Sequence, residues 1–167
     1  GAVGVAMTGE IGLDVVVSQG CRPVGRPYVI TKADDNVVLE LGGRQAIAVL
    51  HETLTSMSPA ERELAQQGSI VAGLVINEMR PAFGLGDFLI RNLVGIDAAA
   101  GALAIADRVQ AGQTLQFHLR DANTARTQLR QLLTQRSETS PAASPVGGLL
   151  FSCTGRGKAF YGTPHQD

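Results

Sequence analysis

The sequence predicts an α+β domain in which helices pack on one face of a mixed, largely antiparallel sheet. Short apolar, β-branched segments recur along the 167 residues and are separated by brief polar turns, a pattern typical of antiparallel strands. Segments with helical spacing follow groups of strands and not every strand, which argues against a regular alternation of strand and helix. A chain of this length can bury one sizeable core, so we expect residues 1–167 to form a single domain.

The first 41 residues predict four strands. Residues 3–7 and 13–18 are apolar runs joined by a glycine-containing turn. Residues 28–32 and 37–41 flank the sequence Ala-Asp-Asp-Asn. Because Asp and Asn tolerate turn geometry, we expect these two strands to form a hairpin.

Two helices and a buried strand are predicted next. Residues 44–57 place apolar side chains at helical spacing. Ser58, Pro59 and Glu61 occupy the N-cap, N1 and N3 positions of a second, short helix that we expect to end near Gly68. The β-branched run that follows, over residues 70–76, is typical of a buried central strand.

The sequence of residues 77–119 predicts a loop and three strands. Residues 77–86 carry a proline and two glycines and predict a loop. A strand over residues 88–93 follows it. We expect residues 103–106 and 114–119 to form another strand pair.

The last third of the chain predicts a helix, a linker and a final strand. Asp121 is the expected N-cap of a helix that carries Ala125 and Leu129 on its apolar side. Residues 137–148 are rich in Ser, Pro, Ala and Gly and predict a flexible linker within the domain. Residues 149–151 are apolar and read as a strand.

Composition excludes several classes of protein. The 14 Lys and Arg residues nearly balance the 15 Asp and Glu residues, so no basic surface for nucleic acid is expected. The longest apolar run is much shorter than the roughly 20 residues that cross a bilayer, and we expect no membrane insertion. The two cysteines form neither a disulfide framework nor a zinc motif, and we interpret them as reduced thiols of a cytoplasmic protein.

Each cysteine follows an apolar segment and lies in a turn rich in glycine and arginine, at residues 18–22 and 152–157. Glycine lets backbone N–H groups approach a ligand, so we predict that both turns line one small-molecule pocket. Arg22 beside Cys21 favours a reactive thiolate, while the alternative is that either cysteine packs as a small apolar residue. The second turn lacks the residues of a P-loop or a dinucleotide fingerprint, but it suits an anion such as a carboxylate.

Two further polar groups have alternative interpretations. Gln116, His118 and Arg120 share one face of a predicted strand, which is either solvated or one wall of a pocket. Arg91 lies in an apolar strand and requires a partner, which is either Asp87 or a ligand carboxylate.

Several of these motifs resemble the C-terminal half of the FIST family, the sensory domain of bacterial signal transduction proteins and F-box proteins. The matching stretches occur in the family's order over nearly the whole chain: residues 16–23, 86–95, 107–114, 116–121 and 151–157. The resemblance implies that the chain is a fragment and that residues 1–18 are the end of a preceding N-terminal domain. It also implies a cytoplasmic module that binds small molecules such as amino acids and signals to a partner protein. The expected ligand-binding residues are Ser18, Gln19, Cys21, Arg22, Arg91, Asn92, Ser152, Cys153, Gly155 and Arg156.

Two other function classes stay open at this point. The same turns could brace a docking surface for a signalling or assembly partner, without any small ligand. A cysteine-dependent enzyme or redox sensor would need a base beside a thiol, and no histidine lies near either cysteine in the sequence. We therefore expect a binding domain that is not an enzyme and has no metal or cofactor.

Overall fold

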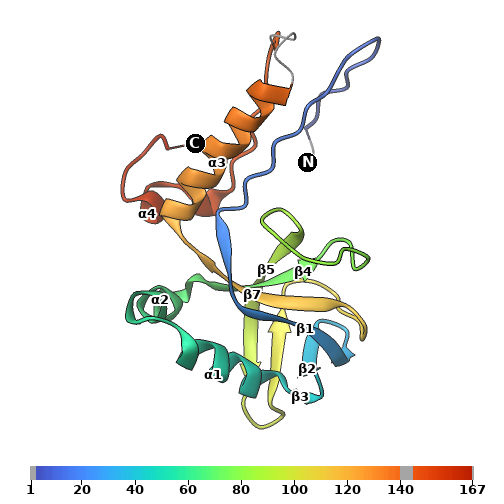
Figure 1. Cartoon of the computed structure of the whole chain (residues 1–167), viewed down its shortest axis with the longest axis vertical. Coiled ribbons are helices and arrows are strands. Elements are labelled where there is room, and N and C mark those ends of the chain that lie inside the picture. The colour runs from blue at the N-terminus through green and yellow to red at the C-terminus, as the bar shows by residue number, and fades with distance from the viewer. Residues whose placement is uncertain (1–2, 140–144, 167) are drawn as a thin grey trace.

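The computed structural model describes residues 3–139 and 145–166, and its strands form a closed antiparallel barrel (Figure 1). Within the described residues the sheet order is β1-β7-β4-β5-β6-β2-β3, every pairing is antiparallel, and β1 also pairs with β2, which closes the ring. The α+β prediction is confirmed. The strands are β1 Cys21–Asp34, β2 Val37–Leu41, β3 Arg44–Gln45, β4 Ile70–Val75, β5 Phe88–Asp97, β6 Ala102–Ile105 and β7 Thr114–Arg120.

Closure depends on β1, which is long enough to serve two neighbours. Its first half pairs with β7, and its second half, from Ile30 onward, pairs with β2. The register of β1 shifts between Val24 and Tyr28, where Gly25 has a φ of 65°. A glycine bulge at this position bends the strand across the barrel.

The barrel interior is the main apolar core. Phe117, Leu115 and Leu119 of β7 are almost completely buried there, together with Ile30 of β1 and Leu103 of β6. α1, Ala46–Ser56, adds Ala46, Val49 and Leu50 to the same cluster. The apolar side chains that alternate along β7 and those at helical spacing on α1 thus pack into one core.

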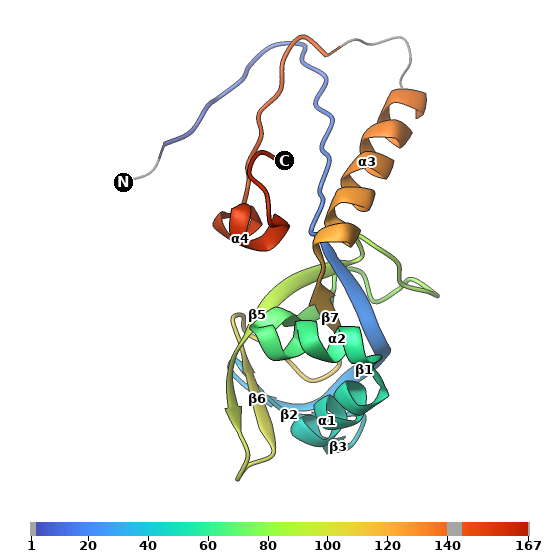
Figure 2. The ribbon, with the colours of Figure 1, turned by 90° about the vertical axis from the view of Figure 1, so that its left-hand side faces the viewer.

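The helices occupy two places. α1 and the short α2, Pro59–Leu64, cover one side of the barrel (Figure 2). The predicted capping box is confirmed, because Ser58 accepts from the Glu61 N–H and Glu61 accepts from the Ser58 N–H. α3, Ala122–Thr139, leaves the barrel from the end of β7 and rises beside the N-terminal segment, and α4 is a single turn, Lys158–Tyr161.

Several sequence predictions are confirmed by the structure. The hairpin of β1 and β2 turns at Asp35 and Asn36, β4 is buried and central, and residues 77–86 form a loop. Asp121 precedes α3 and accepts a hydrogen bond from the Asn123 N–H at 2.9 Å, as expected of an N-cap.

Other predicted elements are wrong. Residues 3–7, 13–18 and 149–151 are extended but belong to no strand in the described chain, because they lie beyond the barrel and have no neighbouring edge to pair with. The predicted pair of residues 103–106 and 114–119 does not form. β6 pairs instead with β5 and β2, and β7 pairs with β1 and β4.

The predicted linker over residues 137–148 is partly helical. α3 continues through Thr139, so the first three residues of the predicted linker belong to it. Residues 140–144 lie outside the described residues, and residues 145–148 are exposed. Helix α3 extends beyond the predicted start of the linker at residue 137 because Ser, Glu and Thr are tolerated in the last turn of a helix.

Candidate functional site

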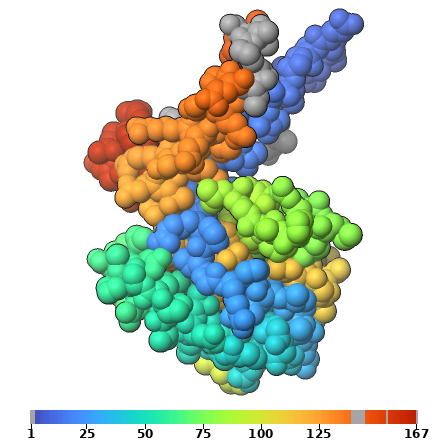
Figure 3. Space-filling view, viewed as in Figure 1, coloured from blue at the N-terminus to red at the C-terminus, as the bar shows by residue number. Residues whose placement is uncertain are grey.

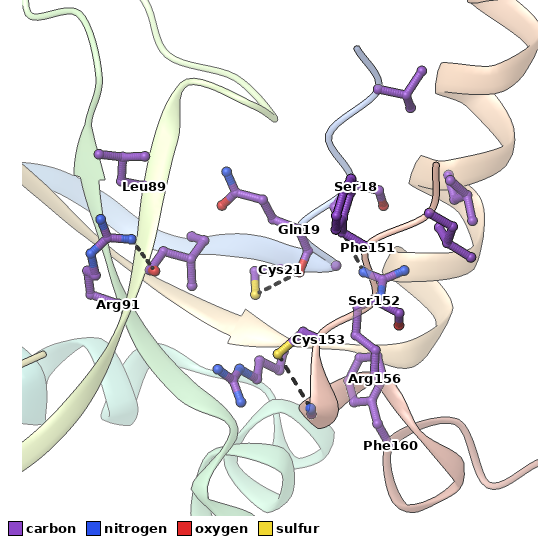
Figure 4. A pocket seen from close by; sticks show the side chains of 17 residues that line it. Ser18, Gln19, Cys21, Leu89, Arg91, Phe151, Ser152, Cys153, Arg156 and Phe160 are labelled. Atoms are coloured by element: carbon purple, nitrogen blue, oxygen red, sulfur yellow. Dashed lines mark hydrogen bonds between the residues drawn. The ribbon is translucent and has the colours of Figure 1, made fainter. Parts of the chain in front are cut away.

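A pocket of about 350 Å³ lies where β1 begins and β7 ends, beside α3 (Figure 4). Both glycine-arginine turns contribute to it, so the prediction that they meet is confirmed. Its lining consists of Val16, Ser18, Gln19, Gly20, Cys21, Leu89, Ile90, Arg91, Arg120, Leu129, Leu150, Phe151, Ser152, Cys153, Gly155, Arg156 and Phe160.

The first turn is fixed against α3 by hydrogen bonds. Gly20 has a φ of 67° and donates its N–H to Oε1 of the buried Gln128 at 3.1 Å, while its carbonyl accepts from the Asp121 N–H at 3.2 Å. Ser18 Oγ donates to the same Gln128 oxygen at 3.4 Å. This left-handed backbone suits glycine and turns the chain from the N-terminal segment into β1.

The second turn is held by a guanidinium. Arg156 Nη1 donates to the Ser18 carbonyl at 3.1 Å, which joins two segments that are remote in sequence. A Cβ on Gly20 would lie 2.8 Å from the same Nη1. Arg156 can therefore reach the Ser18 carbonyl only because residue 20 has no side chain.

The two thiols have different surroundings. Cys21 is buried at the start of β1, and its Sγ donates to the Gln19 carbonyl at 3.5 Å. Burial raises the pKa of the Cys21 thiol, and the nearby Arg120 guanidinium offsets only part of that effect. The prediction of a thiolate favoured by Arg22 is wrong, and Cys21 packs as a neutral thiol. Cys153 is exposed, and its Sγ accepts from the Gly155 N–H at 3.4 Å, at the start of a single 3-10 turn.

Positive charge predominates in the lining. Arg91, Arg120 and Arg156 all reach the pocket, and none of the lining residues is acidic. Arg91 forms an ion pair with Asp107 at the barrel surface. Arg120 donates to the neutral side-chain oxygen of Asn92 at 2.8 Å, and no ion pair of Arg120 occurs within residues 3–139 and 145–166.

Some predicted site residues have structural roles instead. Arg22 does not line the pocket, because it alternates to the other side of β1 from Cys21 and forms ion pairs with Glu61 at 2.7 Å and Asp121 at 3.3 Å. Asn92 also lies outside the lining and orients Arg120.

Asp87, one of the two partners that the sequence predicts for Arg91, does not pair with it. Asp87 pairs with Arg80 of the preceding loop, and Arg91 pairs with Asp107. The sequence spacing of Asp87 and Arg91 places them on one strand face, but the loop brings Arg80 closer.

The interpretation of Gln116 and His118 as a solvated face is wrong. Both are buried, and the His118 ring packs against Phe88 with 4.6 Å between ring centres. Burial lowers the pKa of His118. Only Arg120 of this face reaches the pocket.

Sequence reasoning missed two organising residues. Arg120 enters the site because it is the antiparallel partner of Cys21 in the β1–β7 register. Gln128 is the buried acceptor that holds Ser18 and Gly20. An amide on the apolar side of a predicted helix, one position before Leu129, was the available signal for Gln128.

Among the described residues, no group of three or more His, Cys, Asp or Glu side chains could hold a metal ion. Within the same residues, no helix has the length and apolar character that spanning a membrane would require.

Comparison with known proteins gives two family matches. The model of the FIST C domain matches residues 46–167, and that of the FIST N domain matches residues 1–44. The boundary between the matches falls inside the closed barrel, since β1 and β2 belong to the first match, while β7 and β6, which pair with them, belong to the second.

Curated relatives occur in mycobacteria. An uncharacterized protein of Mycobacterium tuberculosis is 45% identical over the whole chain, which corresponds to 43% of that relative. An uncharacterized protein of Mycobacterium bovis is 43% identical over the whole chain and 42% of its own length. The chain therefore spans less than half the length of these relatives. No solved structure matches.

Proposed function

The chain belongs to the FIST family, and on that basis we propose that it is a cytoplasmic sensory domain that binds a small carboxylate, such as an amino acid, and signals to a partner protein. FIST domains are associated with sensory signal transduction. The observation that carries the ligand class is the charge of the pocket, which Arg91, Arg120 and Arg156 line without any acidic residue.

Arg120 is the best candidate for direct contact with a carboxylate. Its guanidinium lies at the end of β7 and is oriented by Asn92 at 2.8 Å, so it is pre-positioned without being neutralised by that partner. A guanidinium fork offers two parallel N–H groups that match the two carboxylate oxygens. Arg156 adds a second positive group from the 3-10 turn.

The rest of the lining suits a small organic acid. Leu89, Ile90, Leu129 and Phe160 supply apolar surface for a short carbon chain. For an amino acid, the ammonium group needs an acceptor. The Gln19 side chain donates its Nε2 to the Phe88 carbonyl at 2.7 Å, which directs its Oε1 away from that bond and makes it the candidate acceptor.

We further propose that the domain acts by binding and is not an enzyme. A cysteine-dependent reaction needs a thiolate and a base. Cys21 is neutral by burial, and His118 packs against Phe88 outside the pocket lining, with its Nδ1 3.0 Å from the Gln116 carbonyl. The redox-sensor alternative therefore rests on the exposed Cys153 alone.

The test is calorimetric titration of the protein with L-glutamate, L-alanine and succinate, with succinamide as the uncharged control. We expect carboxylates to bind and succinamide to bind at least tenfold more weakly. Arg120→Lys keeps the charge and loses the fork, so affinity should fall about tenfold or more, since a charge-assisted hydrogen bond contributes about 1.5–3 kcal/mol.

The matched control is Arg108→Lys, because Arg108 is 88% exposed and pairs with Asp35 at the far hairpin. Arg108→Lys should bind as the unchanged protein does. Equal affinity for succinate and succinamide, or equal affinity of Arg120→Lys and Arg108→Lys, would refute carboxylate recognition.

A protein-interaction role is the second candidate, and a specific observation favours it. The segments that lead into the two turns expose large apolar side chains, among them Val15, Leu150 and Phe151. Large apolar side chains exposed on neighbouring segments are typical of an interaction site. Such a role is compatible with ligand binding at the pocket.

A further inference from the structure

The N-terminal segment bends at Gly9, where φ is 106° and the Ile11 N–H donates to the Gly9 carbonyl. Beyond this bend, residues 11–17 have the alternation of a strand but pair with no strand in the described chain. The large apolar side chains at its odd-numbered positions, Ile11, Leu13, Val15 and Val17, are 52–73% exposed, while Val16 on the other side is 38% exposed. In an extended chain, alternate positions point to the same side. One whole side of this segment is therefore apolar and open to solvent.

The opposite side of the segment is already occupied. Asp14 forms an ion pair with Arg136 of α3, and Ser18 donates to Gln128 of the same helix. Val16 lies between these two and lines the pocket. α3 therefore holds the segment extended, with Leu13, Val15 and Val17 facing away at 72%, 73% and 58% exposure.

The backbone of the segment is also open. From residue 12 to residue 17, no backbone hydrogen bond occurs within the described part of the chain. An extended chain with unpaired N–H and C=O groups and one apolar side is a template for strand addition. Figure 3 shows this blue segment projecting beyond the barrel alongside α3.

A second exposed apolar stretch lies nearby. Leu149, Leu150 and Phe151 are extended and 61%, 73% and 88% exposed, although Leu150 and Phe151 also line the pocket together with Val16. Both open segments thus border the same pocket. A domain that covered both segments would therefore also cover the opening of the pocket.

We propose that the occupant is the FIST N domain, whose sheet adds residues 11–17 as a strand and covers Leu149–Phe151. Two observations identify it. Residues 1–44 match the FIST N domain by sequence, yet residues 3–20 have no sheet around them in the described chain. The relatives that align with the whole chain are more than twice its length. The pocket then lies at the junction of the two domains. This inference does not depend on the identity of the ligand.

The test is hydrogen exchange on two proteins. The first is the chain of residues 1–167, and the second is this chain fused to the polypeptide that precedes the aligned region in the Mycobacterium tuberculosis relative. We expect the amides of residues 12–17 to exchange in the chain alone as an open segment does, and about 100-fold more slowly in the fusion. Alkylation of the exposed Cys153 by N-ethylmaleimide should slow about tenfold in the fusion, as expected of a thiol that loses its exposure.

Paired variants of the fusion give the control. Leu13→Lys with Val15→Lys places charge on the proposed contact and should restore fast exchange. Ile96→Lys changes a residue of similar exposure, 59%, on β5 of the barrel, and should leave the protection unchanged. Equal effects of the two changes would overturn the proposed surface.

Other outcomes also overturn the proposal. Fast exchange of residues 12–17 in a fusion that melts cooperatively would exclude the FIST N domain as the occupant. Slow exchange in the chain alone, with a dimeric mass by light scattering, would assign the surface to a second copy. If the fusion does not fold, the aligned segment of the full-length mycobacterial relative is measured directly, and an unprotected segment there refutes the inference. If residues 12–17 are protected in the fusion but Cys153 is alkylated as fast as before, the claim that the N domain covers the pocket is refuted.

Discussion

Replacing Gly20 with alanine tests whether the closely fitted first turn holds the candidate site together. Gly20 has a φ of 67°, a conformation that costs an L-residue about 1–2 kcal/mol. A Cβ there would lie 2.8 Å from the Ala125 Cβ of α3 and 2.8 Å from Arg156 Nη1. The Arg156 side chain can move away, but Ala125 is fully buried and its Cβ moves only with the helix.

The expected magnitude is the sum of these two effects. Overpacking against a fixed neighbour costs about 1–3 kcal/mol, so Gly20→Ala should lower the free energy of unfolding by roughly 2–5 kcal/mol. Gly68→Ala is the matched control. Gly68 has a φ of 78°, but nothing lies within 4 Å of its added Cβ, so it carries only the conformational cost.

The assay is urea denaturation followed by far-ultraviolet circular dichroism on both variants and the unchanged protein. Gly20→Ala should be less stable than Gly68→Ala by about 1–3 kcal/mol, the contribution of the clash alone. Displacement of Arg156 should also weaken succinate binding in Gly20→Ala and not in Gly68→Ala. Equal stability of the two variants would refute the argument that Gly20 is required by the contact with α3.

Three further predictions concern the buried groups around the pocket. Gln128→Leu leaves the buried Gly20 N–H without its acceptor and should cost about 1–3 kcal/mol in a urea titration; a loss below 0.5 kcal/mol, roughly the size of a surface substitution, would contradict this. Burial lowers the pKa of His118 in the folded state, so the unfolded chain binds the proton more tightly and stability should fall as the pH drops below about 6.5. His118→Phe should flatten that slope, and an unchanged slope would show that other groups produce it. Brief alkylation with iodoacetamide at pH 7.5 should modify the exposed Cys153 and leave the buried Cys21 intact in a peptide mass map, because burial raises the pKa of Cys21; modification of Cys21 first would contradict its neutral, packed state.

The sequence by itself determined the local elements of this protein. Period-2 spacing in β7, helical spacing in α1 and the Ser58 capping box depend on neighbours within a few positions, and such short-range chemistry can be read from the chain. The Asp-Asn turn between β1 and β2 follows for the same reason. The two turns around Cys21 and Cys153 were also recognisable as one site, because their composition is alike.

Tertiary structure alone decided how these elements combine. The closure of the barrel depends on β1 pairing with both β7 and β2, and no local pattern encodes which strands become neighbours. Arg120 reaches the pocket through its register with Cys21, while Arg22, next to Cys21 in the chain, points away to Glu61 and Asp121. Long-range pairing thus selected which arginines face the site, since adjacent residues of a strand lie on opposite sides.

The N-terminal segment shows what neither the local sequence nor the described fold decides. The sequence predicts strands over residues 3–7 and 13–18, yet a strand exists only when a neighbouring edge satisfies its backbone hydrogen bonds. In the described chain that edge is absent, and the segment lies extended along α3, which it contacts through Asp14 and Ser18. The sequence specified the alternation of this segment, and the tertiary contacts decided which of its sides remained exposed.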